Sequence, residues 1–354
     1  MTPLRIAVIG AGLIGRKHID VLLAGRPEYT LAAVADPSPV AMQEAAQRGY
    51  TCYPTIEEML DKARPDGAIV AVPNQMHVTA GLACIARGVP VLVEKPIADT
   101  LGEALRLVEA AEKAGLPTLT GHHRRHNPIM RRAAETIASG ALGRLVAING
   151  LWLNYKPADY FNVGWRRAPG GGPVLINAIH DIDCLRMLCG DVVSVSANVS
   201  HATRGFAVED TAAAVLTFAN GALGTLLISD TAAAPWAWEW GSRENPLRPN
   251  EPENCYLIAG TKGSLAVPTM RLRWYEDGQS NWDEPMTQQV LHVALEDAYF
   301  EQMRNFTAAI RGTELPRISG RGGAETLATT LAITEAARTG GTVKVQDMLA
   351  AARN

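Results

Sequence analysis

The first third of the chain alternates short apolar runs with longer segments of helical periodicity. The apolar runs are rich in Val, Ile and Ala and lack the polar/apolar alternation of a strand with one wet face. This pattern predicts a parallel sheet covered by helices on both faces, built from βαβ units. We expect strands at 5–10, 30–36, 66–73, 89–96 and 116–121, and helices at 13–25, 77–88 and 101–115.

From about residue 125 the pattern changes. A helical segment at 127–143 leads to a strand-like segment at 144–155, and Asn220-Gly221 separates two strand-like segments within 211–230, a strong hairpin signal. A long loop at 235–254 and late helices at 296–312 and 324–340 follow. We predict an α/β protein with a doubly wound parallel sheet in a domain over 1–123. An α+β domain with an open, mainly antiparallel sheet is expected over 124–354.

Composition restricts the partners. A chain of 354 residues with 33 basic and 36 acidic side chains has no excess positive charge to attract nucleic acid or an anionic membrane, so a small-molecule substrate is expected. Five cysteines without a C-x-x-C pair or His/Cys ligand spacing indicate neither a disulfide framework nor a structural metal site. The N-terminus runs directly into the first strand without a leader pattern, which favours a cytoplasmic protein.

The sequence "GAGLIG" follows the first strand and opens a helical pattern. Gly10, Gly12 and Gly15 have the G-x-G-x-x-G spacing of a Rossmann nucleotide turn, where backbone approaches a pyrophosphate at a helix N-terminus; Leu13 and Ile14 complete it. Asp36 ends the second strand, where a carboxylate accepts the ribose hydroxyls of NAD. Because no Arg follows closely, NAD is preferred over NADP. The alternative for Asp36 is a cap for the next helix.

Two further strand ends carry candidate chemistry, because open α/β sheets bind ligands at the carboxyl ends of their strands. Pro73, Asn74 and His77 follow one strand and are placed to touch the cofactor, although Asn74 could instead cap the next helix. Glu94 and Lys95 end another strand. A lysine there is costly to desolvate, so it has a salt bridge or a task.

These motifs together resemble the Gfo/Idh/MocA family of NAD(P)-dependent oxidoreductases, inositol dehydrogenase included. The matching residues are Gly10 to Gly15, Pro73-Asn74, Glu94-Lys95-Pro96, Gly121 with Arg124-Arg125, Trp165-Arg166, Gly170 to Gly172 and His180 to Asp183. The resemblance implies a Rossmann domain followed by a domain whose open sheet forms homodimers or homotetramers. It also implies that Lys95 contacts substrate and nicotinamide ribose and stabilises the reacting oxygen, with a cis peptide before Pro96.

The stretch "GGGPVLINAIHDID", residues 170–183, introduces a helix expected from Pro173 to Gly190. Its apolar stripe would be Leu175, Ile179, Ile182, Leu185 and Cys189, with Asn177, His180, Asp183 and Cys184 on another face. The glycines would leave room for cofactor or substrate. We interpret His180 as the general base that takes the hydroxyl proton. The alternative is a solvent-facing side of an ordinary helix.

The chain departs from the family one turn before His180. Many members have an aspartate four residues before the histidine, where this chain has Ile176 followed by Asn177. An asparagine orients a hydroxyl or the histidine but accepts no proton. Asp183 is therefore the better candidate for tuning His180, unless it is a solvated helix charge.

Two basic stretches add candidates for the pocket. In "GHHRRHNP", His122 is a substrate candidate and Arg124 a cofactor candidate, although an exposed basic turn would give the same pattern. In residues 154–167 we expect Asn154, Lys156 and Tyr160 near substrate. The resemblance favours Trp165 and Arg166 as cofactor or domain-interface contacts. The extra cations suggest an acidic substrate.

The leading hypothesis is an NAD-dependent dehydrogenase that reversibly oxidises a secondary hydroxyl of a sugar, cyclitol, sugar acid or cyclic hydroxy acid. No metal is needed, because Lys95 and His180 handle charge and proton. A redox-neutral NAD-dependent glycoside hydrolase of the same fold is the main alternative. A non-catalytic NAD-dependent sensor is the third, kept open by the residue at Ile176.

Overall fold

The computed structural model describes residues 2–276 and 281–353, which form two compact units. The first consists of Met1–His126, Ala298–Leu327 and Ala352–Asn354, and the second of Asn127–Asp297 and Ala328–Ala351. The sequence predicts a second domain over 124–354. In the structure, Ala298–Leu327 belongs to the first unit instead.

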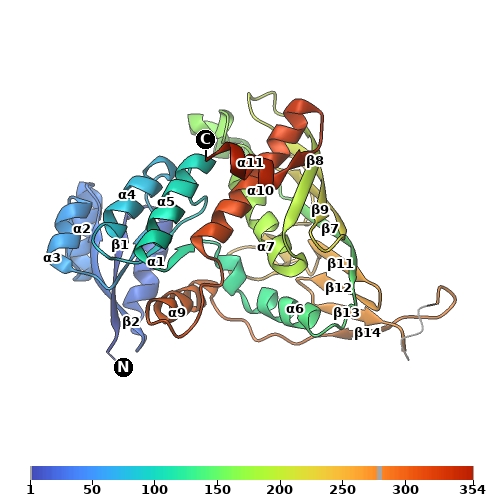
Figure 1. The fold of residues 1–354 in the computed structure, drawn as a ribbon, viewed down its shortest axis with the longest axis horizontal. Coiled ribbons are helices and arrows are strands. Elements are labelled where there is room, and N and C mark those ends of the chain that lie inside the picture. The colour runs from blue at the N-terminus through green and yellow to red at the C-terminus, as the bar shows by residue number, and fades with distance from the viewer. Residues whose placement is uncertain (1, 277–280, 354) are drawn as a thin grey trace. The chain divides into compact units, whose positions relative to one another are not determined.

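The sheet of the first unit has six parallel strands in the order β3-β2-β1-β4-β5-β6. This confirms the doubly wound sheet. Strands β1 and β2 are labelled in the blue, N-terminal part of the ribbon in Figure 1. The strand order reverses between β1 and β4, and ligands of such sheets bind outside the strand ends at that switch. The strands are β1 (Leu4–Ile9), β2 (Tyr29–Ala35), β3 (Cys52–Tyr53), β4 (Gly67–Val70), β5 (Val91–Val93) and β6 (Thr118–Thr120).

The helices of this unit begin where local sequence allows. Thr55 and Thr100 each accept a hydrogen bond from the backbone N–H three residues on, satisfying a donor at the start of α3 and α5. The pattern missed α2 and α3, which are short and bury few side chains. The helical segments are α1 (Leu13–Leu23), α2 (Pro39–Arg48), α3 (Ile56–Ala63), η1 (Asn74–Met76), α4 (His77–Ile85), α5 (Leu101–Ala114), η2 (His123–His126) and α9 (Ala298–Ile310).

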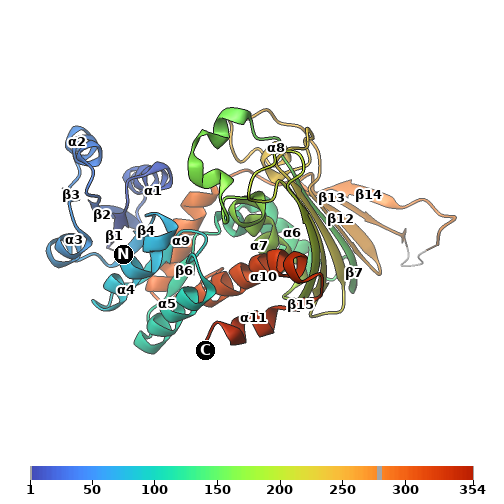
Figure 2. The ribbon, with the colours of Figure 1, turned by 90° about the horizontal axis from the view of Figure 1, so that it is seen from above.

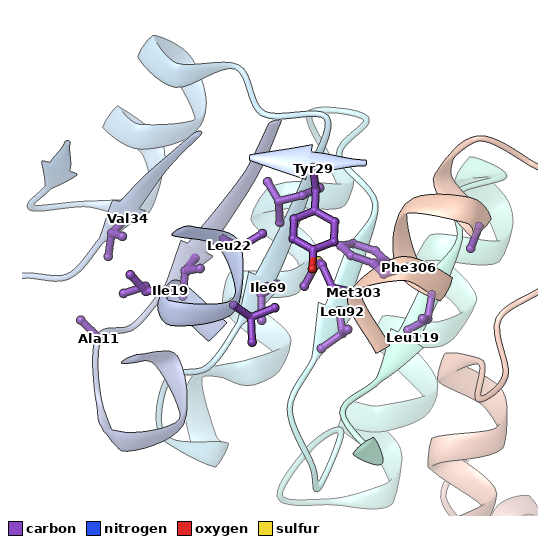
Figure 3. Packing of buried hydrophobic residues seen from close by; sticks show 14 of the residues in the cluster. Ala11, Ile19, Leu22, Tyr29, Val34, Ile69, Leu92, Leu119, Met303 and Phe306 are labelled. Carbon is purple, nitrogen blue, oxygen red and sulfur yellow. The ribbon is translucent and has the colours of Figure 1, made fainter. Parts of the chain in front are cut away.

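Helix α9 belongs to the first unit because its apolar face completes that core. Met303 and Phe306 are fully buried in one cluster with Ile19, Ile69 and Leu92, from α1, β4 and β5 (Figure 3). Burying a side chain of this size contributes about 1.5–3 kcal/mol. Helix α9 therefore supports the layer that carries the glycine-rich turn, although the two lie at opposite ends of the sequence.

The second unit is built on a nine-stranded sheet in the order β14-β13-β12-β11-β7-β10-β9-β8-β15. Only the β7–β10 pair is parallel among the described pairings, which confirms the mainly antiparallel sheet. The predicted hairpin joins β9 and β10, with Gly221 at φ 85°. The strands are β7 (Leu145–Leu153), β8 (Val192–Ser200), β9 (Thr211–Phe218), β10 (Leu223–Ser229), β11 (Tyr256–Gly260), β12 (Gly263–Val267), β13 (Arg271–Trp274), β14 (Thr287–Val290) and β15 (Val343–Lys344).

One face of this sheet is covered and the other is open. Helices α6 and α7 lie along the covered face (Figure 2), where Leu216 and Leu226 are buried, while Val215 and Leu227 alternate with them on the exposed face. The helical segments are α6 (Pro128–Ala138), η3 (Ala158–Asn162), η4 (Gly164–Arg167), η5 (Val174–Ala178), α7 (Ile179–Cys189), α8 (Trp238–Gly241), α10 (Gly320–Thr339), which begins in the first unit, and α11 (Val345–Ala351).

None of the helices in the described ranges has the length and apolar character that crossing a bilayer requires.

Candidate functional site

The glycine-rich turn joins β1 to α1, and its three glycines have different tasks. Gly10 has φ 95°, and a Cβ there would approach the backbone oxygen of Ala71 to 2.6 Å. A Cβ on Gly15 would collide with the backbone oxygen of Gly10. A Cβ on Gly12 would meet nothing within 4 Å, although Gly12 is the N-cap of α1. The two outer glycines are thus required for packing, and Gly12 leaves the helix N-terminus open to a ligand, as a bound pyrophosphate requires.

Asp36 binds this turn from the end of β2. Its carboxylate accepts one hydrogen bond of 2.7 Å from the Ala11 N–H and one of 2.8 Å from the Ser38 N–H. The Ser38 bond closes a turn just before α2; the N-cap of that helix is Ser38, so Asp36 is not the cap that the alternative reading proposed. The Ala11 bond fixes the carboxylate beside the nucleotide turn.

His77 and Asn74 follow β4. The His77 ring is buried, and its nitrogens lie 2.8 Å from the Pro96 carbonyl and 2.9 Å from the Val72 carbonyl. Burial holds the pKa of His77 below its ordinary value despite those carbonyls. The ring therefore joins the loop after β4 to the loop after β5. Asn74 begins the short helix η1 with Pro73 as its N-cap, so it does not cap that helix.

The end of β5 carries a buried carboxylate that is hydrogen-bonded to a histidine. Glu94 Oε1 lies 2.8 Å from His18 Nε2, and both side chains are buried. Burial opposes ionisation of Glu94, but the hydrogen bond from His18 and the nearby charges outweigh it, so the pKa of Glu94 lies below its ordinary value. The second oxygen accepts the Lys95 N–H at 3.2 Å, and the Lys95–Pro96 peptide is cis as expected.

Glycine and aromatic residues enclose this pair. A Cβ on Gly121 would lie 2.7 Å from the Glu94 carboxyl carbon, so only glycine lets β6 pass so close. The Tyr299 ring contacts His18 edge-on at 5.5 Å between centroids and stacks on His123 at 4.7 Å. The Glu94 carboxylate that binds the Lys95 N–H is therefore closely packed by its neighbours.

The basic stretch after β6 is not an exposed turn, so that alternative is wrong. His122, Arg124 and His126 are buried, and all three have interaction partners in the protein. Burial of an arginine requires such partners. The predicted contacts of His122 with substrate and of Arg124 with cofactor stay predictions.

In the second unit, the glycine run 170–172 serves close packing of the chain itself. A Cβ on Gly171 would collide with the backbone oxygen of Trp165, and one on Gly172 would collide with the Glu209 carboxylate. Glu209 Oε1 accepts the Val174 N–H at 3.1 Å. The expectation that these glycines leave room for a ligand is therefore wrong at Gly171 and Gly172, where protein atoms fill the space.

The helix that follows also differs from its prediction. It starts with a π-helical turn, η5, and becomes α-helical only at Ile179, so residues before and after this point do not keep simple i, i+4 spacing. Every residue of α7 except Met187 is buried, His180 and Asp183 included. The solvent-facing alternative is thus wrong. Such π turns are frequent at functional sites.

The π turn brings Asn177 to Lys156, which follows β7. Lys156 Nζ donates a hydrogen bond of 2.7 Å to Asn177 Oδ1 and lies 3.6 Å from Asp230 Oδ2. Burial lowers the pKa of Lys156 to about 8, against the opposing effect of Asp230. Its ammonium also approaches the rings of Trp152 and Tyr160, at 5.4 and 4.8 Å from their centroids.

Arg204 shares the carboxylate of Asp230 with Lys156. Its Nε donates to Asp230 Oδ1 at 3.0 Å, and its Nη2 donates to the backbone oxygens of Asp230 and Lys156. Glu209 is the other acid nearby, and burial raises its pKa. The acceptors around Lys156 are thereby already engaged by protein donors.

The remaining candidates within residues 154–167 differ in burial and in their contacts. Asn154 is buried, and its Oδ1 accepts from Trp240 Nε1 at 3.1 Å. Arg166 stacks over Tyr160 at 3.9 Å from the ring centroid and donates to the Tyr160 carbonyl, but its buried Nε has no hydrogen-bond partner among residues 2–276 and 281–353. Trp165 is 54% exposed.

Sequence reasoning missed four residues that build these sites: His18, Arg204, Glu209 and Asp230. His18 had a signal, because it sits three positions after Gly15 on the predicted helix. Asp230 ends the predicted hairpin, whereas Arg204 and Glu209 lie in a segment for which the sequence predicted no element, and only the folded sheet joins the three to Lys156.

Within the described part of the chain, no cluster of three or more His, Cys, Asp or Glu side chains could hold a metal ion.

The fold and the nucleotide turn define an NAD-binding oxidoreductase with a Rossmann domain and a sheet-based second domain. Residues 4–122 match the profile of the oxidoreductase family with an NAD-binding Rossmann fold, and residues 130–266 match the GFO/IDH/MocA C-terminal domain. The chain belongs to the GFO/IDH/MocA family, as the sequence resemblance indicated.

Three relatives illustrate the match. The rhizopine catabolism protein MocA of Rhizobium meliloti is 32% identical over 191 residues, 54% of this chain and 58% of that protein. The 1,5-anhydro-D-fructose reductase of Ensifer adhaerens is 28% identical over 97% of this chain and 98% of that protein. An oxidoreductase from Agrobacterium radiobacter, solved with NAD+, L-tartaric acid and magnesium, has the same fold, with a TM-score of 0.80 at 21% identity over 98% of this chain and 100% of that one.

Proposed function

We propose that the protein is an NAD-dependent dehydrogenase that reversibly oxidises a secondary hydroxyl of a sugar, cyclitol, sugar acid or cyclic hydroxy acid. The observation that carries this is the glycine-rich turn, in which Gly12 alone leaves the N-terminus of α1 open, with Lys95 held at the end of β5 in the same unit. Bound NAD would supply the hydride acceptor at nicotinamide C4.

Lys95 is the residue that stabilises the reacting oxygen. Its backbone N–H is bound by the buried Glu94 carboxylate. A cation near an oxygen that gains negative charge as its proton leaves lowers the barrier by electrostatic stabilisation. Lys95 also contacts the nicotinamide ribose in this proposal.

His180 is the general base. It takes the hydroxyl proton while the adjacent C–H bond delivers its hydride, which leaves a carbonyl product. Asp183 lies one turn further along α7, where a buried carboxylate orients and stabilises the charged form of the ring. Asn177 orients the substrate. Replacement of His180 by Ala should lower the rate by about 10²–10⁴-fold.

The cofactor is held by the turn, by strand ends and by the basic stretches. We assign this contact to Gly10, Gly12, Leu13, Ile14, Gly15, Asp36, Pro73, Asn74, His77, Glu94, Lys95, Arg124, Trp165 and Arg166. Asp36 gives the preference for NAD, because its carboxylate beside the turn would repel the 2′-phosphate of NADP. Better turnover with NADP than with NAD would contradict this preference.

Substrate contacts are assigned to Lys95, His122, Asn154, Lys156, Tyr160, Asn177 and His180. The proposed activity is tested by following NADH formation with polyols, aldoses, sugar acids and cyclic hydroxy acids. Stoichiometric NADH with at least one class supports the dehydrogenase. Release of sugar from glycosides without net NADH supports a hydrolase instead.

We further propose that the open sheet face joins copies of the chain into a homodimer or homotetramer. Val215, Leu227 and Leu257 are exposed there, and an apolar face of this kind is typical of an interface. Sedimentation of the purified protein should give a dimer or tetramer, and Leu257→Arg should shift it toward monomer. A monomeric wild-type protein would contradict the proposal.

A further inference from the structure

The contact between Lys156 and Asn177 fixes which way the Asn177 amide points. The two ends of an asparagine amide have opposite hydrogen-bonding character, and only a neighbour with one character decides between them. Lysine ammonium is such a neighbour, because it has three donors and no acceptor. At 2.7 Å from Nζ the amide oxygen must face Lys156, so the NH₂ group faces away.

That NH₂ group is available. Asn177 is only partly buried, and in the described ranges its side chain makes no hydrogen bond other than the one from Lys156. Two N–H donors therefore face away from the protein partners of the π turn. An aspartate at this position would have offered acceptors instead.

Among the described residues, the side chains around Lys156 also offer more free hydrogen-bond donors than free acceptors. Asp230 is engaged by Lys156 and Arg204, and Glu209 Oε1 accepts the Val174 N–H. Arg166, stacked on the ring that Lys156 also approaches, has a buried Nε without a partner among residues 2–276 and 281–353. A buried donor without an acceptor is unfavourable, and a ligand acceptor relieves that cost.

We propose that Asn177 is a specificity-determining residue, oriented by Lys156 to donate hydrogen bonds, and that the substrate is a hydroxy compound carrying a carboxylate. This inference rests on the proposed dehydrogenase function and narrows its substrate class. A carboxylate has acceptors only and is negatively charged, so it matches surplus donors beside a lysine. A hydroxyl at the same place matches them less well.

The test compares kcat/KM for acids and for neutral analogues with the same skeleton. Suitable pairs are D-gluconate against D-gluconamide and sorbitol, and quinate against its methyl ester, each assayed by NADH formation. The wild-type protein should favour the acid of an active pair by at least about tenfold, the effect of one good charge-assisted hydrogen bond. Asn177→Asp, which replaces the donors with a carboxylate, should lower that ratio by about tenfold or more.

Asn149→Asp is the matched control, because Asn149 lies on β7 and donates to Thr225 on the neighbouring strand. It should leave the acid-to-neutral ratio unchanged. Affinity for NAD, measured by fluorescence titration, should be the same in all three proteins. A wild-type preference for neutral substrates, or an unchanged ratio in Asn177→Asp, overturns this inference alone. Absence of NADH from every class of alcohol overturns the proposed function and this inference with it.

Discussion

Lys156 Nζ donates a hydrogen bond of 2.7 Å to Asn177 Oδ1. This bond joins the segment that follows β7 to the π turn before α7. Neither partner is unusual in sequence. The bond connects a buried lysine directly to Asn177, one of the proposed substrate-binding residues. The protonation state of Lys156 should therefore be visible in substrate selection.

We predict that selection for acids weakens as the pH rises through about 8. Burial lowers the pKa of Lys156 to about 8, and the neutral amine above that pH both attracts an anion less and accepts a hydrogen bond, so the Asn177 amide is free to turn. The measurement is the acid-to-neutral ratio of kcat/KM, which cancels the pH dependence of the redox equilibrium. The charged or titratable groups around Lys156 are Asp230, Arg204, Arg166, Glu209 and Tyr160.

Lys156→Met is the control for this titration. It should lower the ratio at neutral pH and remove its change near pH 8, while Lys62→Met, at an exposed i,i+4 pair, should keep the wild-type profile. A wild-type ratio that stays constant from pH 7 to pH 9.5 would contradict the assignment of Lys156.

The buried pair of His18 and Glu94 should dominate the stability of the β5 end. Glu94→Gln should lower the free energy of unfolding by about 1.5–3 kcal/mol, because it removes the charged acceptor of a buried hydrogen bond with His18. Glu103→Gln, which loses an exposed pair with Arg106, should cost under about 1 kcal/mol. Chemical denaturation of both variants measures the difference.

This contribution has a definite pH dependence. The folded pKa of Glu94 lies below its ordinary value, so the contribution of its carboxylate is present above pH 4.5 and is lost as the pH falls through the folded pKa. The difference between wild type and Glu94→Gln should therefore shrink on acidification below pH 4.5. A difference that grows on acidification would show that the pair is not ionised in the folded protein.

Alanine variants of two glycines in the nucleotide turn should have different effects, one on cofactor binding and the other on stability. Gly12→Ala adds a methyl group where no protein atom lies within 4 Å, so the melting temperature should stay within about 2 °C of wild type while NAD affinity falls. Gly15→Ala forces its Cβ onto the Gly10 carbonyl and should lower the melting temperature by several degrees. If Gly12→Ala bound NAD as wild type does, this turn would not be the nucleotide site.

The hydrophobic pattern was sufficient to predict most of the parallel sheet, because β4, β5 and β6 are buried on both faces and β1 is buried over its last four residues, so each reads as an apolar run. The edge strand β3 has only two half-buried residues, so it gave no such run and was not predicted. The hairpin at Asn220-Gly221 was predictable for a similarly local reason, since Gly221 supplies the positive φ that the turn requires. Helix α9 was visible as a helix, but its place in the first core depends on Met303 and Phe306 packing on distant strands.

The candidate sites were predictable only in part. Gly10, Gly12 and Gly15 were predictable because they form one short sequence motif between a strand and a helix. Lys95 was predictable because it lies at the carboxyl end of a predicted strand. The π turn at 174–178 could not be read from periodicity, because it breaks the helical period on which the reading depends. The same holds for the buried surroundings of His180, which looked like one face of an amphipathic helix.

The most direct test of the central claim is the stoichiometry of NADH and carbonyl product in the wild-type protein and in Lys95→Met. We predict equal amounts of NADH and carbonyl product from a hydroxylated substrate, and turnover in Lys95→Met that falls to background while its affinity for NAD stays within about threefold of wild type, since cofactor binding rests mainly on the glycine-rich turn. Wild-type turnover in Lys95→Met, or product formed without NADH, would contradict the account.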